Sequence, residues 1–71
     1  MEIAILKTDI SSGEEFRRVR HRLKGFYKIK ECTIDLEDID KVVRVIGDKI
    51  ESSDIIDRIK SFGYICEELQ D

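Results

Sequence analysis

The side chains best suited to chemistry lie in the loop before the first predicted helix. Asp9, Glu14 and Glu15 supply carboxylate oxygens, the ligands that hard cations such as Mg²⁺ and Ca²⁺ prefer. The same acids suit a helix N-terminus, where the helix dipole favours negative charge. Ser12 with Glu15, or Ser11 with Glu14, also fits a capping box, in which hydroxyl and carboxylate satisfy each other's backbone N–H groups. We expect solvated, helix-capping acids here rather than a hard-cation site.

The other reactive side chains are isolated in the sequence. His21 lies on the polar side of the first predicted helix and has no Ser, Cys or Asp partner at a recognisable spacing. Cys32 and Cys66 are too few and too far apart for a disulfide framework or a zinc site, and we expect them to be small buried hydrophobes. Because no nucleophile–base pair, phosphate-cradling loop or ligand set is visible, the sequence predicts no enzyme activity and no cofactor.

Positive charge is concentrated on the first predicted helix. Residues 1–30 carry eight Lys or Arg against four Asp or Glu, whereas residues 31–71 carry five against twelve, so the net charge of −3 conceals a dipolar chain. Such a surface can dock to an acidic protein surface or to the chain's own acidic half, or it can simply be solvated. The sequence pI of about 5.1 disfavours nucleic acid as the partner. The candidate partner-binding residues are Arg17, Arg18, Arg20, Arg22 and Lys24.

Hydrophobic periodicity predicts the elements that position these residues. A spacing of three, four and three from Phe16 to Phe26 indicates one apolar stripe of a helix, with Gly25 as a left-handed cap. Alternation with a period of two indicates strands, and a second helix opens at Ser52 or Ser53 and closes at Gly63. The predicted order is a strand (2–7), a helix (from 12), two strands joined as a hairpin (28–36 and 41–46), a helix (from 52) and a strand (64–69).

This βαββαβ order defines the fold class. Right-handed crossovers place both helices on one face of a four-stranded antiparallel sheet, so we expect an α+β domain of the ferredoxin-like type over residues 1–71. Seventy-one residues make one small domain. No apolar run exceeds about four residues, so neither a membrane span nor a signal peptide is expected, and a cytoplasmic protein is the default.

The alternation within each strand assigns side chains to the two faces of the sheet. The inward set is Ala4, Leu6, Cys32, Ile34, Leu36, Val43 and Val45. The outward set is aliphatic and would be contiguous on the two central strands, which favours self-association through this face, although scattered surface aliphatics are common. The candidate self-association residues are Ile3, Ile5, Val42 and Ile46, with Ile65 beside them.

The ordered pattern resembles a known family over all 71 residues. The segment 55–64 (IIDRIKSFGY), the strand ends at Asp35 and at 45–47 (VIG), and the opening 6–10 (LKTDI) are similar to heavy-metal-associated (HMA) domains. These are the modules of copper chaperones and P-type ATPases, and the resemblance implies their fold. It also implies that the basic surface of the first helix meets acidic partner domains.

In that family a Met-x-Cys-x-x-Cys motif in the loop entering the first helix binds the metal. Two thiols three residues apart at a helix N-terminus are readily deprotonated, and soft sulfur selects Cu(I). If Val19 is the buried aliphatic four residues after the second cysteine, this sequence has Ile10 at the methionine position, Ser12 at the first cysteine and Glu15 at the second. An alcohol and a carboxylate cannot replace thiolates for Cu(I).

We therefore expect a non-enzymatic interaction module that resembles an HMA domain and has lost metal binding. One alternative is a metal-homeostasis protein that binds a heavy-metal ion through atypical ligands, either Ser12 and Glu15 or the two cysteines. Another is a regulatory domain that senses a small molecule, because such domains share the βαββαβ order. Cys32 and Cys66 fall on opposite edge strands of the predicted sheet, too distant to share an ion or a disulfide.

Overall fold

The computed structural model describes residues 1–69 and has the predicted element order. Each element begins and ends within a few residues of its sequence prediction, and the last strand is shorter than predicted, with three residues. The elements are β1 (Glu2–Thr8), α1 (Gly13–Lys24), β2 (Lys28–Asp35), β3 (Val42–Asp48), α2 (Ser52–Ser61) and β4 (Cys66–Glu68).

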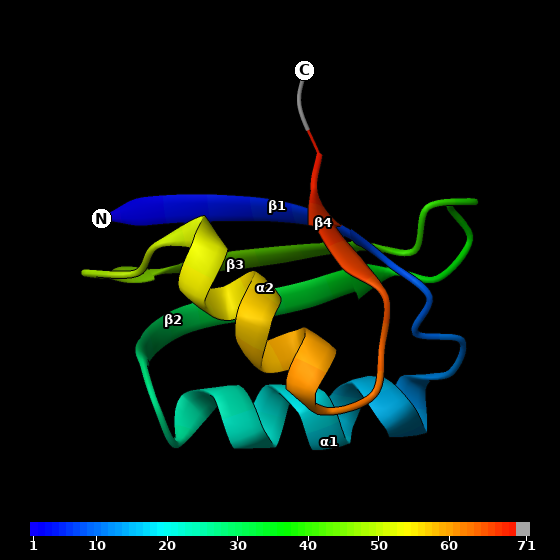
Figure 1. Cartoon of the computed structure of the whole chain (residues 1–71), viewed down its shortest axis with the longest axis horizontal. Helices are drawn as coiled ribbons and strands as arrows, with labels where there is room; N and C mark the ends of the chain where they lie inside the picture. Colours follow the sequence, from blue (N-terminus) through cyan, green and yellow to red (C-terminus); the bar gives the residue numbers. More distant parts are fainter. Residues whose placement is uncertain (70–71) are drawn as a thin grey trace.

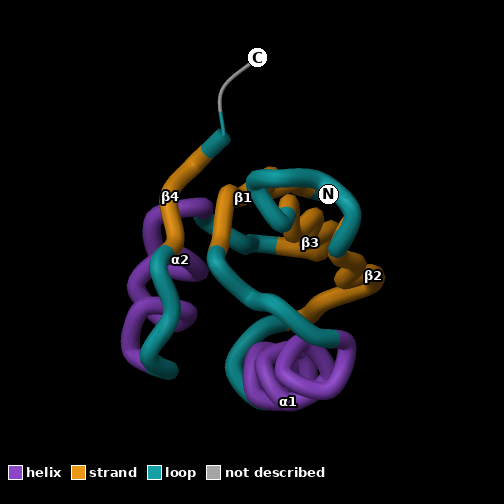
Figure 2. Tube along the Cα trace, turned by 90° about the vertical axis from the view of Figure 1, so that its right-hand side faces the viewer, coloured by secondary structure: helices purple, strands orange, loops and turns teal. Residues whose placement is uncertain are grey.

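The four strands form one antiparallel sheet in the order β2-β3-β1-β4. The central strands β1 and β3 pair from Glu2 opposite Gly47 to Leu6 opposite Val43. Helix α1 packs along β2, and α2 packs against β1 and β4, on the same side of the sheet (Figures 1 and 2). The ferredoxin-like α+β prediction is confirmed. Neither helix in residues 1–69 has the length and apolar character needed to span a bilayer.

The core lies between the sheet and the two helices, where the inward-facing residues of the strands meet the helical stripes. Of the predicted inward set, Ile34 is only partly buried, and Leu36 lies beyond the end of β2 and outside the core cluster. Two loop residues complete the core without having been predicted, Ile10 before α1 and Ile50 before α2. The buried hydrophobic side chains are Ala4, Leu6, Ile10, Phe16, Val19, Leu23, Cys32, Val43, Val45, Ile50, Ile55, Ile59 and Cys66.

The helix ends differ in part from the sequence prediction. Helix α1 ends at Lys24, and Gly25 follows in right-handed helical geometry (φ −75°), so the predicted left-handed cap is wrong. Phe26 lies beyond the helix and is 57% exposed, so it does not extend the buried stripe. Helix α2 is preceded by Glu51, which makes no side-chain cap bond, in place of the predicted serine cap. Gly63 does end α2, with the positive φ of +100° that glycine adopts without steric cost.

Two reciprocal cation–π contacts join the helices to each other. The guanidinium carbon of Arg22 on α1 lies 5.1 Å from the ring centroid of Phe62, just after α2. The guanidinium carbon of Arg58 on α2 lies 3.9 Å from the ring centroid of Phe26, just after α1. Each contact is within the range in which a cation is attracted to an aromatic face. These two contacts therefore supplement the apolar packing that each helix makes with the sheet.

Candidate functional site

A cluster of oxygen atoms surrounds the carboxylate of Glu15 at the N-terminus of α1. Ser12 is the N-cap residue, in extended geometry (φ −143°), and its Oγ accepts from the Glu15 backbone N–H at 3.1 Å. Glu15 Oε1 in turn accepts from the hydroxyl of Ser11 at 2.7 Å and from that of Ser12 at 3.3 Å. Half of the capping box predicted for Ser12 is therefore present; the other half differs, because Glu15 reaches back to the Ser11 backbone N–H (3.4 Å) instead of that of Ser12.

A fourth side chain of this cluster comes from the other end of the chain. The hydroxyl of Tyr64, in the loop between α2 and β4, donates to Glu15 Oε2 at 3.2 Å. The loop carrying Tyr64 is fixed there because Asp9 Oδ1 accepts from the Ile65 backbone N–H at 2.8 Å. We call Ser11, Ser12, Glu15 and Tyr64 the α1 mouth. Sequence reasoning missed Tyr64, and only the Gly-Tyr pair after the second helix could have indicated it.

The residue assigned to the family's methionine position lies elsewhere. Ile10 is fully buried in the core, and its backbone N–H donates to Thr8 Oγ at 3.3 Å. The Thr8 hydroxyl itself donates to the Lys41 carbonyl at 2.8 Å, which ties the start of the loop to the β2–β3 connection. The structure thus brings Ser12 and Glu15 together and leaves Ile10 as the apolar anchor of their loop.

The hydrogen bonds of the α1 mouth shift the pKa values of Glu15 and Tyr64. The Ser11 hydroxyl lowers the pKa of Glu15 below its ordinary value of 4.5; desolvation opposes this effect, and the weaker hydrogen bond from Tyr64 adds to the lowering. Desolvation and the bond to Glu15 raise the pKa of Tyr64. Glu15 is therefore an anionic oxygen donor, and Tyr64 a neutral hydroxyl, over the physiological range. Such a set favours cations that prefer oxygen ligands.

The lowered pKa of Glu15 predicts a pH-dependent stabilisation. A carboxyl group with a depressed folded-state pKa contributes stability above its unfolded-state pKa, and this contribution is lost as pH falls through the folded-state pKa. The stability difference between the native sequence and Glu15→Gln is expected to be constant above about pH 6 and to shrink below about pH 4.5. Urea unfolding of both proteins across this range measures it. A difference that stays unchanged at low pH would contradict the assigned role of the Glu15 carboxylate.

The two cysteines are buried as predicted and cannot act together. Cys32 lies on β2 and Cys66 on β4, the two outer strands, with β3 and β1 between them. Three strand spacings separate them by about 14 Å, and both thiols are free. Burial raises the pKa of each thiol to about 11, so neither is a thiolate near neutral pH. Within residues 1–69, no three His, Cys, Asp or Glu side chains come together to hold a metal ion.

The basic residues of α1 lie mostly on its exposed side. Arg17, Arg18, Arg22 and Lys24 are exposed, as is His21. Arg20 is half-buried, with its guanidinium carbon 5.7 Å from the ring centroid of Phe16, and belongs only in part to this surface. Arg18 and Arg22 both line a hollow of about 110 Å³ beside Phe62 and Tyr64.

The aliphatic residues predicted for self-association lie on the sheet face opposite the helices. Ile3 is 61% exposed and pairs across the strands with half-buried Ile46. Ile5 pairs with Arg44, which lies between Val42 and Ile46 along β3 and interrupts the patch with a positive charge. The face is therefore apolar with a charged centre. Association of two copies through it remains a prediction.

Comparison with known proteins identifies a solved structure with a similar fold. No protein-family model matches the sequence, and a comparison with curated proteins finds no match either. Among solved structures, the chain is similar to the yeast copper transporter domain Ccc2A, whose solution structure was determined in the apo and Cu(I)-loaded states. The TM-score is 0.82 at 20% sequence identity, and the alignment covers 100% of this chain and 99% of the copper transporter domain.

This likeness corrects one expectation from the sequence. We expected an interaction module that had lost metal binding, but the structural neighbour is a copper transporter domain aligned over 99% of its length. That finding contradicts the expectation of lost metal binding and favours the alternative, a metal-homeostasis protein with atypical ligands. The chain has the fold of an HMA-like domain.

Proposed function

We propose that this chain is a metal-homeostasis domain that binds a metal ion as cargo through oxygen ligands at the α1 mouth. One observation carries the proposal: the hydroxyl groups of Ser11, Ser12 and Tyr64 converge on the carboxylate of Glu15. The cluster lies where the loop enters α1, the position at which the resembled family binds metal. The fold shared with a copper transporter domain supports the same role.

The donor set indicates which ions fit. It contains one carboxylate and three hydroxyl groups, and sulfur is absent from it because both cysteines lie in the core. Oxygen ligands suit hard or borderline divalent cations, which retain several water ligands when the protein supplies few, whereas Cu(I) prefers sulfur. The helix dipole opposes cation binding at this terminus, so Glu15 must supply the compensating negative charge. We therefore expect weak, exchangeable binding of a divalent cation, as suits cargo.

The basic surface of α1 adjoins this site. Arg18 lies one helical turn after Glu15 and shares a hollow with Tyr64. We propose that the partner is a protein with an acidic surface, and that the exposed residues Arg17, Arg18, Arg22 and Lys24 are what it contacts. Charge complementarity supports this, because opposite potentials steer association and fix its register. Carboxylates of the docked partner would then lie beside the ion and could accept it.

The decisive experiment is a metal titration of the native chain and two matched variants. Mn²⁺, Zn²⁺ and Cu²⁺ are titrated by calorimetry, and Cu(I) is titrated against a competing chelator. We expect one-to-one binding of a divalent ion, weakened about tenfold or more by Glu15→Gln, since loss of a supporting ligand typically weakens a metal site 10–100-fold. Glu14→Gln removes an exposed carboxylate from the same helical turn and should leave the affinity unchanged.

Three results would overturn the proposal. Failure of every ion to bind would exclude a metal-homeostasis role for the isolated chain. Tight Cu(I) binding that survives Glu15→Gln would exclude the oxygen site, because the ion would then have other ligands. Equal weakening by Glu14→Gln and Glu15→Gln would show only a general effect of negative charge, and would exclude the assigned site as well.

A further inference from the structure

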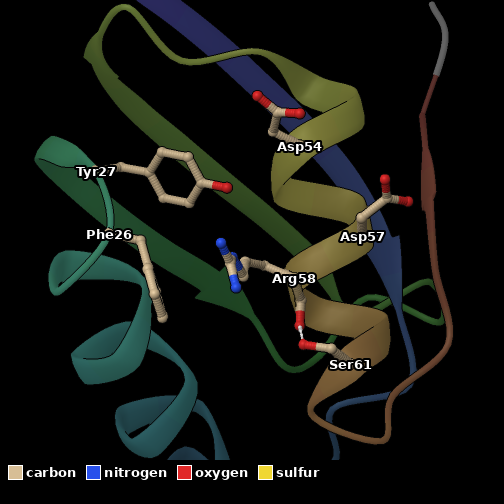
Figure 3. A pocket seen from close by; sticks show the side chains of 6 residues that line it. All are labelled: Phe26, Tyr27, Asp54, Asp57, Arg58 and Ser61. Carbon is tan, nitrogen blue, oxygen red and sulfur yellow. Dashed lines mark hydrogen bonds between the residues drawn. The ribbon is translucent and has the colours of Figure 1, made fainter.

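A hollow of about 440 Å³ lies between the end of α1 and the outer side of α2, away from the α1 mouth. Two aromatic rings, two carboxylates, a guanidinium and a hydroxyl line it (Figure 3). Helix α1 has 12 residues and is therefore about 18 Å long, so Phe26 and Tyr27, which follow its end, are separated from Ser12 at its start by about the length of the helix. Its lining residues are Phe26, Tyr27, Asp54, Asp57, Arg58 and Ser61.

The charged groups of this hollow form no ion pair within the described residues. Arg58 extends from α2 so that its guanidinium lies beside the Phe26 ring, 3.9 Å from its centroid, with Tyr27 above it in the view of Figure 3. Asp54 precedes Arg58 by four residues, the spacing at which helix ion pairs form. Yet within residues 1–69 Arg58 pairs with no carboxylate, and neither Asp54 nor Asp57 has a cationic partner. One guanidinium and two carboxylates therefore remain available to a ligand.

We propose that this hollow binds a free α-amino acid with a cationic side chain. Two carboxylates and one guanidinium leave the hollow with one excess negative charge, and such an amino acid supplies two cationic groups and one carboxylate. Its carboxylate is bound by the forked guanidinium of Arg58, which suits bidentate contacts. Its ammonium and side-chain cation are bound by Asp54 and Asp57. The Tyr27 ring offers an aromatic face to a guanidinium or ammonium group.

The proposal is independent of metal binding at the α1 mouth. None of the residues lining the hollow belongs to the oxygen cluster around Glu15. A variant of the hollow should therefore leave the metal titration unchanged, and Glu15→Gln should leave amino-acid binding unchanged. Failure of either proposal can be recognised without reference to the other.

The test is a nuclear magnetic resonance titration of the ¹⁵N-labelled chain with L-arginine and L-lysine. Saturable shifts are expected at the backbone amides of residues 26, 27 and 54–61, with a dissociation constant of about 1 mM, since the site is open to solvent. Agmatine, which lacks the carboxylate, and L-citrulline, which lacks the side-chain charge, should each bind about two- to fivefold more weakly.

Matched variants assign the contacts. Asp54→Asn is expected to weaken L-arginine binding about two- to fivefold, whereas Glu51→Gln removes a carboxylate from the same helix end outside the hollow and should not. Arg58→Lys keeps the positive charge but loses the forked guanidinium that would bind the ligand carboxylate. It should therefore weaken binding of L-arginine more than binding of agmatine. The spectrum of each variant reports directly whether it is folded. Absence of saturable shifts, equal binding of L-citrulline, or equal effects of Asp54→Asn and Glu51→Gln would each overturn the proposal.

Discussion

A Ser12→Cys/Glu15→Cys double variant is expected to bind Cu(I) more tightly than the native chain by several orders of magnitude. The two thiols would stand three residues apart at the N-terminus of α1, where the helix dipole lowers thiol pKa values and supplies thiolates. Thiolates are the preferred ligands of Cu(I), and the native oxygen cluster is not. Titration of Cu(I) against a competing chelator measures the gain. The variant also loses the Ser12 cap, at a cost of about 1 kcal/mol in stability.

The control for this variant places the same pair at the opposite end of a helix. Asp57→Cys/Lys60→Cys introduces two exposed cysteines three residues apart near the C-terminus of α2. There the dipole disfavours thiolates, so this variant should bind Cu(I) more weakly than the first. Equal affinities would mean that the α1 mouth gives no advantage to a metal, and that Ser12 and Glu15 do not mark the ligand positions.

Replacing Gly47 by alanine is expected to destabilise the fold by about 3 kcal/mol or more. Gly47 is buried in β3 opposite Ile29, beside the irregularity in register between Ile29 and Glu31. A Cβ atom there would collide with the backbone carbonyl oxygen of Lys28 and approach Ile29 Cα to 3.2 Å. Both obstacles belong to the backbone, so relief requires β2 to move away from β3.

This loss is large relative to the stability available. A chain of this length has about 4–11 kcal/mol in total, at 0.05–0.15 kcal/mol per residue. Urea unfolding monitored by circular dichroism gives the change, and Gly13→Ala is the matched control. A Cβ at Gly13 meets no atom within 4 Å, and alanine favours a helix by up to about 1 kcal/mol over glycine. If the two variants unfold at the same urea concentration, the close approach of β2 at Gly47 is wrong.

Local signals allowed most of the fold to be predicted. Ser12 with Glu15 marked the start of α1 because capping depends on residues only three apart. The alternation of Ala4 with Leu6 and of Val43 with Val45 marked the buried face, because side chains in a strand alternate between the two sides. The separation of Cys32 from Cys66 followed from topology alone. Each of these inferences needed only the residues of one element, or one rule for how successive elements connect.

The features that were predicted wrongly or not at all share a physical cause, since each depends on contacts between segments distant in sequence. Phe26 matched the helical spacing but lies beyond the helix end, where Arg58, 32 residues later, covers its ring instead of the core. Tyr64 reaches Glu15 across 49 residues, and apart from the Gly-Tyr pair no local pattern indicates such a partner. The predicted serine cap of α2 is absent, since Glu51 precedes the helix and makes no side-chain cap bond. The packing of Ile55 and Ile59 in the core stabilises the helix instead.

The paired Arg–Phe contacts give the two-helix layer a built-in redundancy. Each helix contributes one guanidinium, and the residues just after each helix contribute one ring. The helices are therefore joined at two separate points by the same kind of cation–π contact. A ligand that drew Arg58 toward itself would break the contact with Phe26. The contact of Arg22 with Phe62 would still hold the two helices in their relative position. Ligand exchange at the proposed amino-acid site would therefore leave the contact between the helices next to Tyr64 in place.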